Sequence, residues 1–174
     1  MDRAVILTVV GSDRPGLTRA IAEAVYAAGG NWLESHLSRL GGKYVGSVLI
    51  ELPEERLHEL QAAVGGIDAF GIKVDIIAAA EADEHSGEFL GIDIVGQDRP
   101  GIVREVTSVL AGLNVNIEDF SSKIEGSAWS GAPLFRAKVK MLLPAGLSID
   151  EVRTALEAIS SEIMVDFDSE SASG

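Results

Sequence analysis

The sequence contains no cysteine, and its 14 lysines and arginines are outnumbered by 27 aspartates and glutamates. Without cysteine the chain has neither a disulfide framework nor thiolate chemistry, which fits a reducing, cytoplasmic setting. The net charge of −13 repels nucleic acid and anionic membranes, so we expect no direct DNA binding. No stretch approaches the roughly 20 apolar residues that span a membrane. The first apolar run, 4–10, lacks a small-residue cleavage site, so it is not interpreted as a signal peptide.

Catalytic and metal-binding signatures are missing as well. The three histidines, His36, His58 and His85, lie far apart and not at metal-ligand spacing. There is no nucleophile elbow, phosphate-binding loop or dinucleotide fingerprint. Carboxylates are plentiful, but most fall on expected helix faces or in a charged stretch, where they are typical of solvated surface. We therefore expect a protein that is not an enzyme and that needs no cofactor or metal.

One stretch of the sequence occurs twice. Residues 10–17 read VGSDRPGL and residues 95–102 read VGQDRPGI, so that Asp98 follows Asp13 by 85 positions. Each copy follows an apolar run and precedes an amphipathic one, which indicates a turn from a strand into a helix. The repeat predicts two domains, residues 1–80 and 89–168, joined by a charged linker at 81–88 and followed by a loose tail at 169–174.

Hydrophobic periodicity predicts the same order of elements in both halves. In the first half we expect strands at 4–10, 31–40, 44–52 and 70–77, with a hairpin turn at Gly41-Gly42. Helices begin at Pro15 and Pro53 and are expected to end at Gly29-Gly30 and Gly65-Gly66. The second half repeats this order, with its last strand at 163–167. The order β-α-β-β-α-β predicts an α+β protein of two ferredoxin-like domains, each a four-stranded antiparallel sheet with two helices on one face.

The second half differs from the first in a long loop at 125–133 that replaces the hairpin turn. Trp129 in this loop is either tucked against its own domain or an anchor for a partner. In the strand that follows, Phe135, Ala137, Val139 and Met141 alternate with Arg136, Lys138 and Lys140. We expect Asp93 to lie across from these cations. Their face is either solvated or a partner-binding surface.

The repeated turn is the candidate ligand site. The first backbone amides of a helix have no partner inside the helix and carry partial positive charge, so they can receive a carboxylate. Gly16 and Gly101 leave room for a ligand to approach the backbone. A side-chain amide from the next strand and a carboxylate for an ammonium group would complete an amino-acid clamp. The residues that offer these groups are Asn31 and Asn116, and Asp13 and Asp98.

The same residues also fit a structural role. Asp13 and Asp98 can cap the amides of their own helices, which would leave none for a ligand. In this interpretation Asn31 and Asn116 only form hydrogen bonds at the start of a strand. Arg14 and Arg99 are expected to face solvent. The sequence leaves both interpretations open.

The pattern of a strand, Asp-Arg-Pro-Gly, a helix and then Gly-Asn-Trp or Val-Asn-Ile resembles a tandem pair of ACT domains over about residues 4–167. The pairing, together with the segment SGAPLF at 130–135, is similar to the glycine cleavage system transcriptional repressor family. The resemblance implies sensing of amino acids at interfaces between ACT modules. In the serine-binding type the residue before Arg-Pro-Gly is often Asn, whereas this chain has Asp in both copies. The ligand-binding residues it implies are Asp13, Arg14, Pro15, Gly16, Leu17 and Asn31, and Asp98, Arg99, Pro100, Gly101, Ile102 and Asn116.

Three functional hypotheses follow. The first is a non-catalytic regulator that senses a small amino acid, with glycine as the leading candidate, and controls transcription of amino-acid metabolism through a partner activator protein. The second is a regulatory subunit that acts in trans on a metabolic enzyme. The third is a ligand-independent dimerisation module. The small cores and open sheet edges of such domains predict a homodimer in each case.

Overall fold

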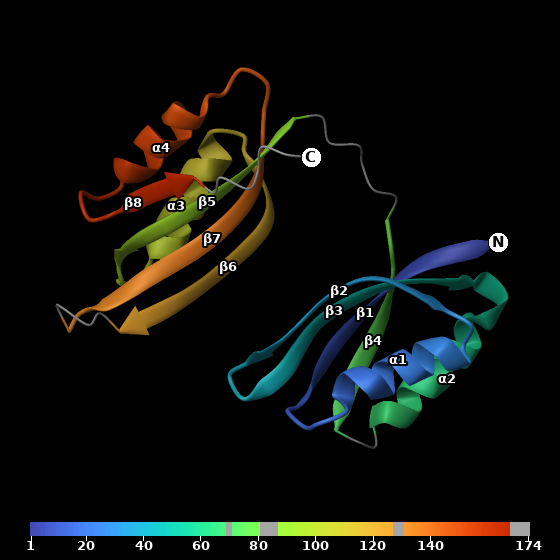
Figure 1. The fold of residues 1–174 in the computed structure, drawn as a ribbon. Coiled ribbons are helices and arrows are strands. Elements are labelled where there is room, and N and C mark those ends of the chain that lie inside the picture. Colours follow the sequence, from blue (N-terminus) through green and yellow to red (C-terminus); the bar gives the residue numbers. More distant parts are fainter. Residues whose placement is uncertain (69–70, 81–86, 127–130, 168–174) are drawn as a thin grey trace. The chain divides into compact units, whose positions relative to one another are not determined.

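The computed structural model describes residues 1–68, 71–80, 87–126 and 131–167. The chain divides into two units, Met1–Ala82 and Asp83–Gly174. Each unit has its own sheet and its own helices (Figure 1). The tail and most of the expected linker lie outside the described residues.

The first unit is a four-stranded antiparallel sheet in the order β2-β3-β1-β4. Its two α-helices cover one face of this sheet (Figure 1), and a single 3-10 turn, η1, leads into the second of them. The element order β-α-β-β-α-β agrees with the prediction. The elements are β1 (Asp2–Ser12), α1 (Leu17–Ala27), β2 (Asn31–Leu40), β3 (Lys43–Pro53), η1 (Glu54–Arg56), α2 (Leu57–Asp68) and β4 (Ile72–Ala78).

The second unit repeats the first. Its strands are also antiparallel and follow the order β6-β7-β5-β8. The ferredoxin-like prediction is therefore confirmed for both halves of the chain. The elements are β5 (Glu88–Gln97), α3 (Ile102–Gly112), β6 (Asn116–Gly126), β7 (Pro133–Leu143), α4 (Ile149–Glu157) and β8 (Met164–Phe167).

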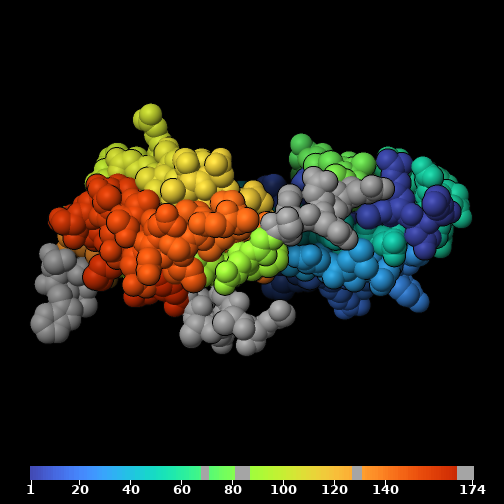
Figure 2. Space-filling model, turned by 90° about the horizontal axis from the view of Figure 1, so that it is seen from above, coloured from blue at the N-terminus to red at the C-terminus, as the bar shows by residue number. Residues whose placement is uncertain are grey.

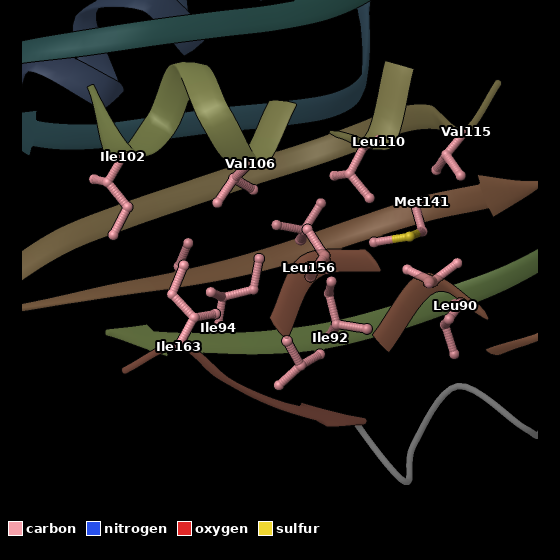
Figure 3. Close-up of a cluster of buried hydrophobic side chains, with 14 of the residues drawn as sticks. Leu90, Ile92, Ile94, Ile102, Val106, Leu110, Val115, Met141, Leu156 and Ile163 are labelled. Atoms are coloured by element: carbon pink, nitrogen blue, oxygen red, sulfur yellow. The ribbon is translucent and has the colours of Figure 1, made fainter. Parts of the chain in front are cut away.

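Each unit buries its apolar side chains between the sheet and the helices. In the second unit, Ile102, Val106 and Leu110 point from α3 towards Ile92 and Ile94 of β5 (Figure 3). Helical spacing on one element and alternate spacing on the other produce this contact. The alternation expected in β7 is confirmed, because four side chains of that strand are buried, those of Phe135, Ala137, Val139 and Met141.

Two details of the fold differ from the sequence interpretation. Gly65 and Gly66 do not end a helix, because α2 continues to Asp68. Glycine lowers helix stability by only about 1 kcal/mol each, and the buried Val64 and Ile67 on either side hold this turn against the core. The loop expected at 125–133 is shorter than expected, because β6 runs to Gly126 and pairs it with Pro133.

One outer strand of each sheet, β2 in the first unit and β6 in the second, carries one extra residue near its beginning. The pairing of β2 with β3 skips from Trp32 to Glu34, and that of β6 with β7 skips from Ile117 to Asp119. The residues left out, Leu33 and Glu118, are 85 positions apart, so this β-bulge is a feature of the repeat.

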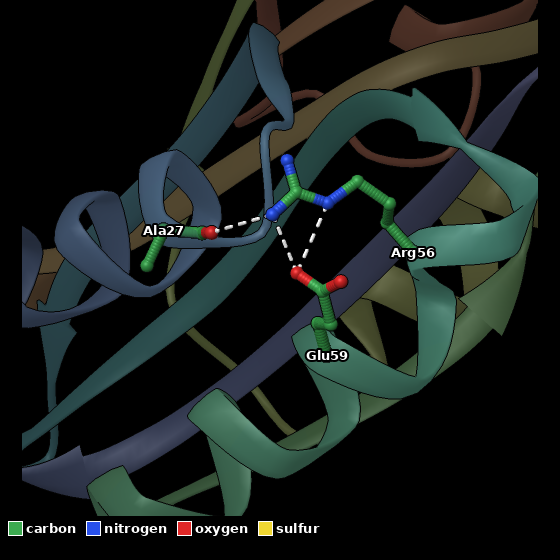
Figure 4. Close-up of polar contacts among 3 residues, drawn as sticks. All are labelled: Ala27, Arg56 and Glu59. Carbon is green, nitrogen blue, oxygen red and sulfur yellow. Dashed lines mark hydrogen bonds and ion pairs between the residues drawn. The ribbon is translucent and has the colours of Figure 1, made fainter.

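Side-chain caps hold two of the helix ends. In the first unit Arg56 donates to the carbonyl of Ala27 at the end of α1, at 3.2 Å, and also bonds Glu59 (Figure 4). In the second unit Ser148 and Glu151 form a capping box at the start of α4. The hydrogen bond from Arg56 lowers the pKa of Glu59, and the bonds from Ser148 lower that of Glu151.

Candidate ligand site

The two repeated turns have the same backbone form. Gly16 precedes α1 with φ of 90°, and Gly101 precedes α3 with φ of 89°. Left-handed backbone of this kind favours glycine, and no atom lies within 4 Å of the position where a Cβ would stand on either residue. The glycines therefore shape the turn and also leave open space beside it.

The aspartates of the turns do not cap the helices. In the described part of the chain, the amides of Leu17, Thr18 and Arg19 donate no hydrogen bond, and those of Val103 and Arg104 donate none either. The structure thus leaves unpaired donors at both helix starts, which is the condition that the ligand-site interpretation required.

Charge pairing differs between the two turns. Asp13 is bound by Arg39, whose Nε lies 3.0 Å from its Oδ2, whereas the residue 85 positions after Arg39 is Ile124. Asp98 therefore lacks this cation, and its side chain has no partner among the described residues. Asp98 is also half-buried, whereas Asp13 is exposed.

The arginines of the turns differ in the opposite way. Arg14 is exposed, as expected, and has no ion-pair partner in the described part of the chain. Arg99, contrary to expectation, is half-buried and binds both oxygens of Glu105, one at 2.9 Å. These hydrogen bonds lower the pKa of Glu105. The counterpart of Glu105 in the first unit is Ala20, so Arg14 has no such carboxylate.

Four of the candidate residues flank the turns without offering polar side chains. Pro15 and Pro100 are exposed, whereas Leu17 and Ile102 are buried in the cores. Leu17 and Ile102 can therefore meet a ligand only through their backbone.

The two asparagines lie at the far end of their own sheets, away from the turns of their own units. Asn31 is level with Glu51 and Ala4, whereas the turn follows Ser12, eight residues along β1 and about 26 Å away. The reason is topological: a β-α-β crossover makes β1 and β2 run in the same direction, so the end of one lies far from the start of the other.

Asn116 has the same placement, level with Leu142 and Phe89. Its side chain donates to Glu118. Neither asparagine meets the turn of its own unit.

A pocket of about 690 Å³ adjoins the second turn. Three predicted site residues, Arg99, Pro100 and Gly101, form one side of it. The residues that the sequence interpretation missed are Arg104, Glu105, Ser108, Val109 and Ile159. They come from the exposed side of α3 and from the segment after α4.

The cations of β7 are paired within their own sheet. Arg136 Nε lies 3.1 Å from Glu125, Lys138 lies 3.8 Å from Asp93, and Lys140 stands over the ring of Phe89. The expectation that Asp93 lies across from these cations is confirmed. Trp129 lies outside the described residues.

The described residues contain no cluster of histidine, cysteine or carboxylate side chains placed to hold a metal ion. None of the helices within these ranges is long and apolar enough to cross a membrane.

Comparison with known proteins supports the two-domain fold. Models of the ACT domain match residues 3–76 and residues 91–160. Over 75 residues the chain is 35% identical to UPF0237 protein MK1213 of Methanopyrus kandleri, a stretch that covers 43% of this chain and 78% of that protein.

Two solved structures share the fold along nearly the whole chain. An unknown protein from Galdieria sulphuraria is 25% identical with a TM-score of 0.77, and the match covers 97% of this chain and 98% of that one. A candidate glycine cleavage system transcriptional repressor is 15% identical with a TM-score of 0.71, and the match covers 97% of each chain. The chain belongs to the ACT-domain family and carries two ACT domains in tandem.

Proposed function

We propose that the protein is a non-catalytic cytoplasmic regulator that binds a small amino acid at its helix-initial turns. The observation that carries this proposal is the unpaired state of the first amides of α1 and α3, which neither Asp13 nor Asp98 caps. Such amides, with the positive end of the helix dipole, receive a carboxylate.

The second turn is the better equipped of the two. Asp98 has no cationic partner and can accept an ammonium group, whereas Asp13 is already neutralised by Arg39. If asparagine side chains take part, they must come from another module, because Asn31 and Asn116 lie far from the turns of their own units.

Glycine is the first ligand to test, because the tandem pairing of the two domains and the sequence SGAPLF at 130–135 resemble the glycine cleavage system repressor family. The net charge of −13 disfavours direct contact with DNA, so control of transcription would run through a partner protein. Ligand binding changes this interaction only if the ligand prefers one arrangement of the protein over another.

Titration calorimetry with a panel of amino acids tests ligand binding. We expect heat with glycine or another small amino acid, and weaker binding in Asp98→Asn, which keeps the size of the side chain but removes its charge. Asp13→Asn is the matched control, because Arg39 already occupies that carboxylate. Absence of heat and of thermal stabilisation with every amino acid at millimolar concentration would leave a ligand-independent dimerisation module.

The partner and the oligomeric state need separate measurements. A pull-down with and without the bound amino acid distinguishes a transcriptional activator from a metabolic enzyme, and ligand should change the yield. Light scattering at micromolar concentration is expected to give the mass of a homodimer, and a monomeric mass would remove that part of the proposal.

A further inference from the structure

The pocket beside the second turn has a free cation on its wall. In the space-filling view the yellow-green atoms of α3 form part of the surface of the second unit (Figure 2). Arg104, on this helix, lines the pocket, is exposed and makes no ion pair among the described residues.

The first repeat shows why this arginine is free. Arg19, 85 positions before Arg104, binds Glu23 one turn further along α1, at 2.8 Å. The counterpart of Glu23 is Ser108, which is too short and carries no charge. The second unit thus keeps the arginine, loses its carboxylate partner and has a pocket at this place.

The remaining walls define what the pocket can hold. Glu105 also lines it, and Arg99 binds both of its oxygens, while the nearby charge of Arg104 contributes to lowering the pKa of Glu105 without forming an ion pair with it. Val109, Ile159 and Pro100 offer apolar surface. A volume of about 690 Å³ falls within the usual range for small-molecule sites, about 300–1,000 Å³.

We infer that this pocket binds an aliphatic carboxylate larger than glycine, with the carboxylate on Arg104 and Ser108 and the apolar body against Val109 and Ile159. Glycine has no side chain and would leave the apolar wall uncovered. The inference goes beyond the proposed function, because it places a carboxylate on the side chains of Arg104 and Ser108 and not on the first amides of α3.

Two variants test the pocket without changing a core residue: one fills it, and the other removes its positive charge. Ser108→Glu restores the pairing of the first repeat, so the new carboxylate should bind Arg104 and exclude the ligand. Arg104→Gln removes the charge. Ser108→Ala keeps the pocket open and removes only the hydroxyl, so it should weaken binding less than Ser108→Glu does, and Arg19→Gln is the matched control on the other module. All three positions are exposed, and circular dichroism should confirm that each variant folds.

Calorimetry uses valine, leucine and glycine as probes, together with 3-methylbutanoate, which lacks the amine, and 2-methylpropylamine, which lacks the carboxylate. We expect the aliphatic acids to bind and the amine alone not to bind. Arg104→Gln and Ser108→Glu should weaken binding about tenfold or more, the usual loss for a charged hydrogen bond, whereas Arg19→Gln should have no effect.

The outcomes separate this inference from the proposed function. Glycine binding as tightly as valine, or binding of valine that is unchanged in Arg104→Gln, would overturn the inference and leave amino-acid sensing in place. Absence of binding heat with every probe, glycine included, would overturn both the inference and the proposed function.

Discussion

Replacing Gly46 with alanine should nearly unfold the first unit. Gly46 lies in β3 opposite Val9 and Leu37, with φ of 151°. A Cβ on this residue would stand 1.9 Å from the carbonyl oxygen of His36, a separation that real contacts never show. The obstacle is the backbone of β2, so no rotation of a side chain can relieve it.

The size of the effect follows from the distance that β2 must move. The strand has to retreat by more than 1 Å, which breaks about two of the ladder hydrogen bonds around Gly46, at about 1 kcal/mol each. Backbone strain adds about 1–3 kcal/mol. The total of about 3–5 kcal/mol approaches the whole free energy of unfolding of a small domain.

Urea unfolding followed by the fluorescence of Trp32, in β2, measures this effect in a Trp129→Phe background. The matched control is Ala137→Gly, because Ala137 lies opposite Ile94 as Gly46 lies opposite Val9. Loss of its buried methyl group and added chain entropy should cost only about 1–2 kcal/mol in the second unit, whose unfolding is followed by far-ultraviolet circular dichroism because that unit has no tryptophan in this background. An unfolding free energy of Gly46→Ala within about 1 kcal/mol of wild type would refute the steric argument.

Three further predictions concern the second unit. Because Arg99 lowers the pKa of Glu105, their pairing stabilises the fold above the unfolded pKa of about 4.3, and this contribution is lost as pH falls through the lower, folded value. A carboxyl NMR titration should show Arg99→Gln raising the pKa of Glu105; an unmoved pKa would disprove the assignment of the cause. Ser148→Ala removes the capping box and should cost about 1 kcal/mol in urea unfolding, and no loss would mean that water replaces the cap. Gly101→Ala has free space but unfavourable φ and should cost about 1–2 kcal/mol in thermal unfolding, whereas an unchanged midpoint would show that the turn relaxes.

The fold was predictable from the sequence because local signals agreed with one another. Helical spacing after Pro15 and Pro100 and alternation along residues 135–141 each indicated one element, and the repeat gave the domain count. Gly65 and Gly66 misled because burial of their neighbours outweighs helix propensity.

The site was only partly predictable. The strand-to-helix turns lie where the sequence indicated, and the parallel direction of β1 and β2, which the crossover rule predicts from element order alone, separates each turn from the asparagine of its own unit. Arg104 and Ser108 could have been found by comparing the repeats at a spacing of 85, since Glu23 has no acidic counterpart. The ion pair between Arg99 and Glu105 could not be predicted from the sequence, because the two residues are six positions apart and only one of them lies in the helix.

The extra residue in β2 and in β6 limits how each sheet can be extended at that edge. At Leu33 and Glu118 the alternation of outward-facing backbone donors and acceptors shifts by one place. A strand from another molecule that pairs in register with the residues after the bulge is therefore out of register with the residues before it. Growth of either sheet into an endless fibril is disfavoured at this edge, and association is directed towards closed assemblies of few copies.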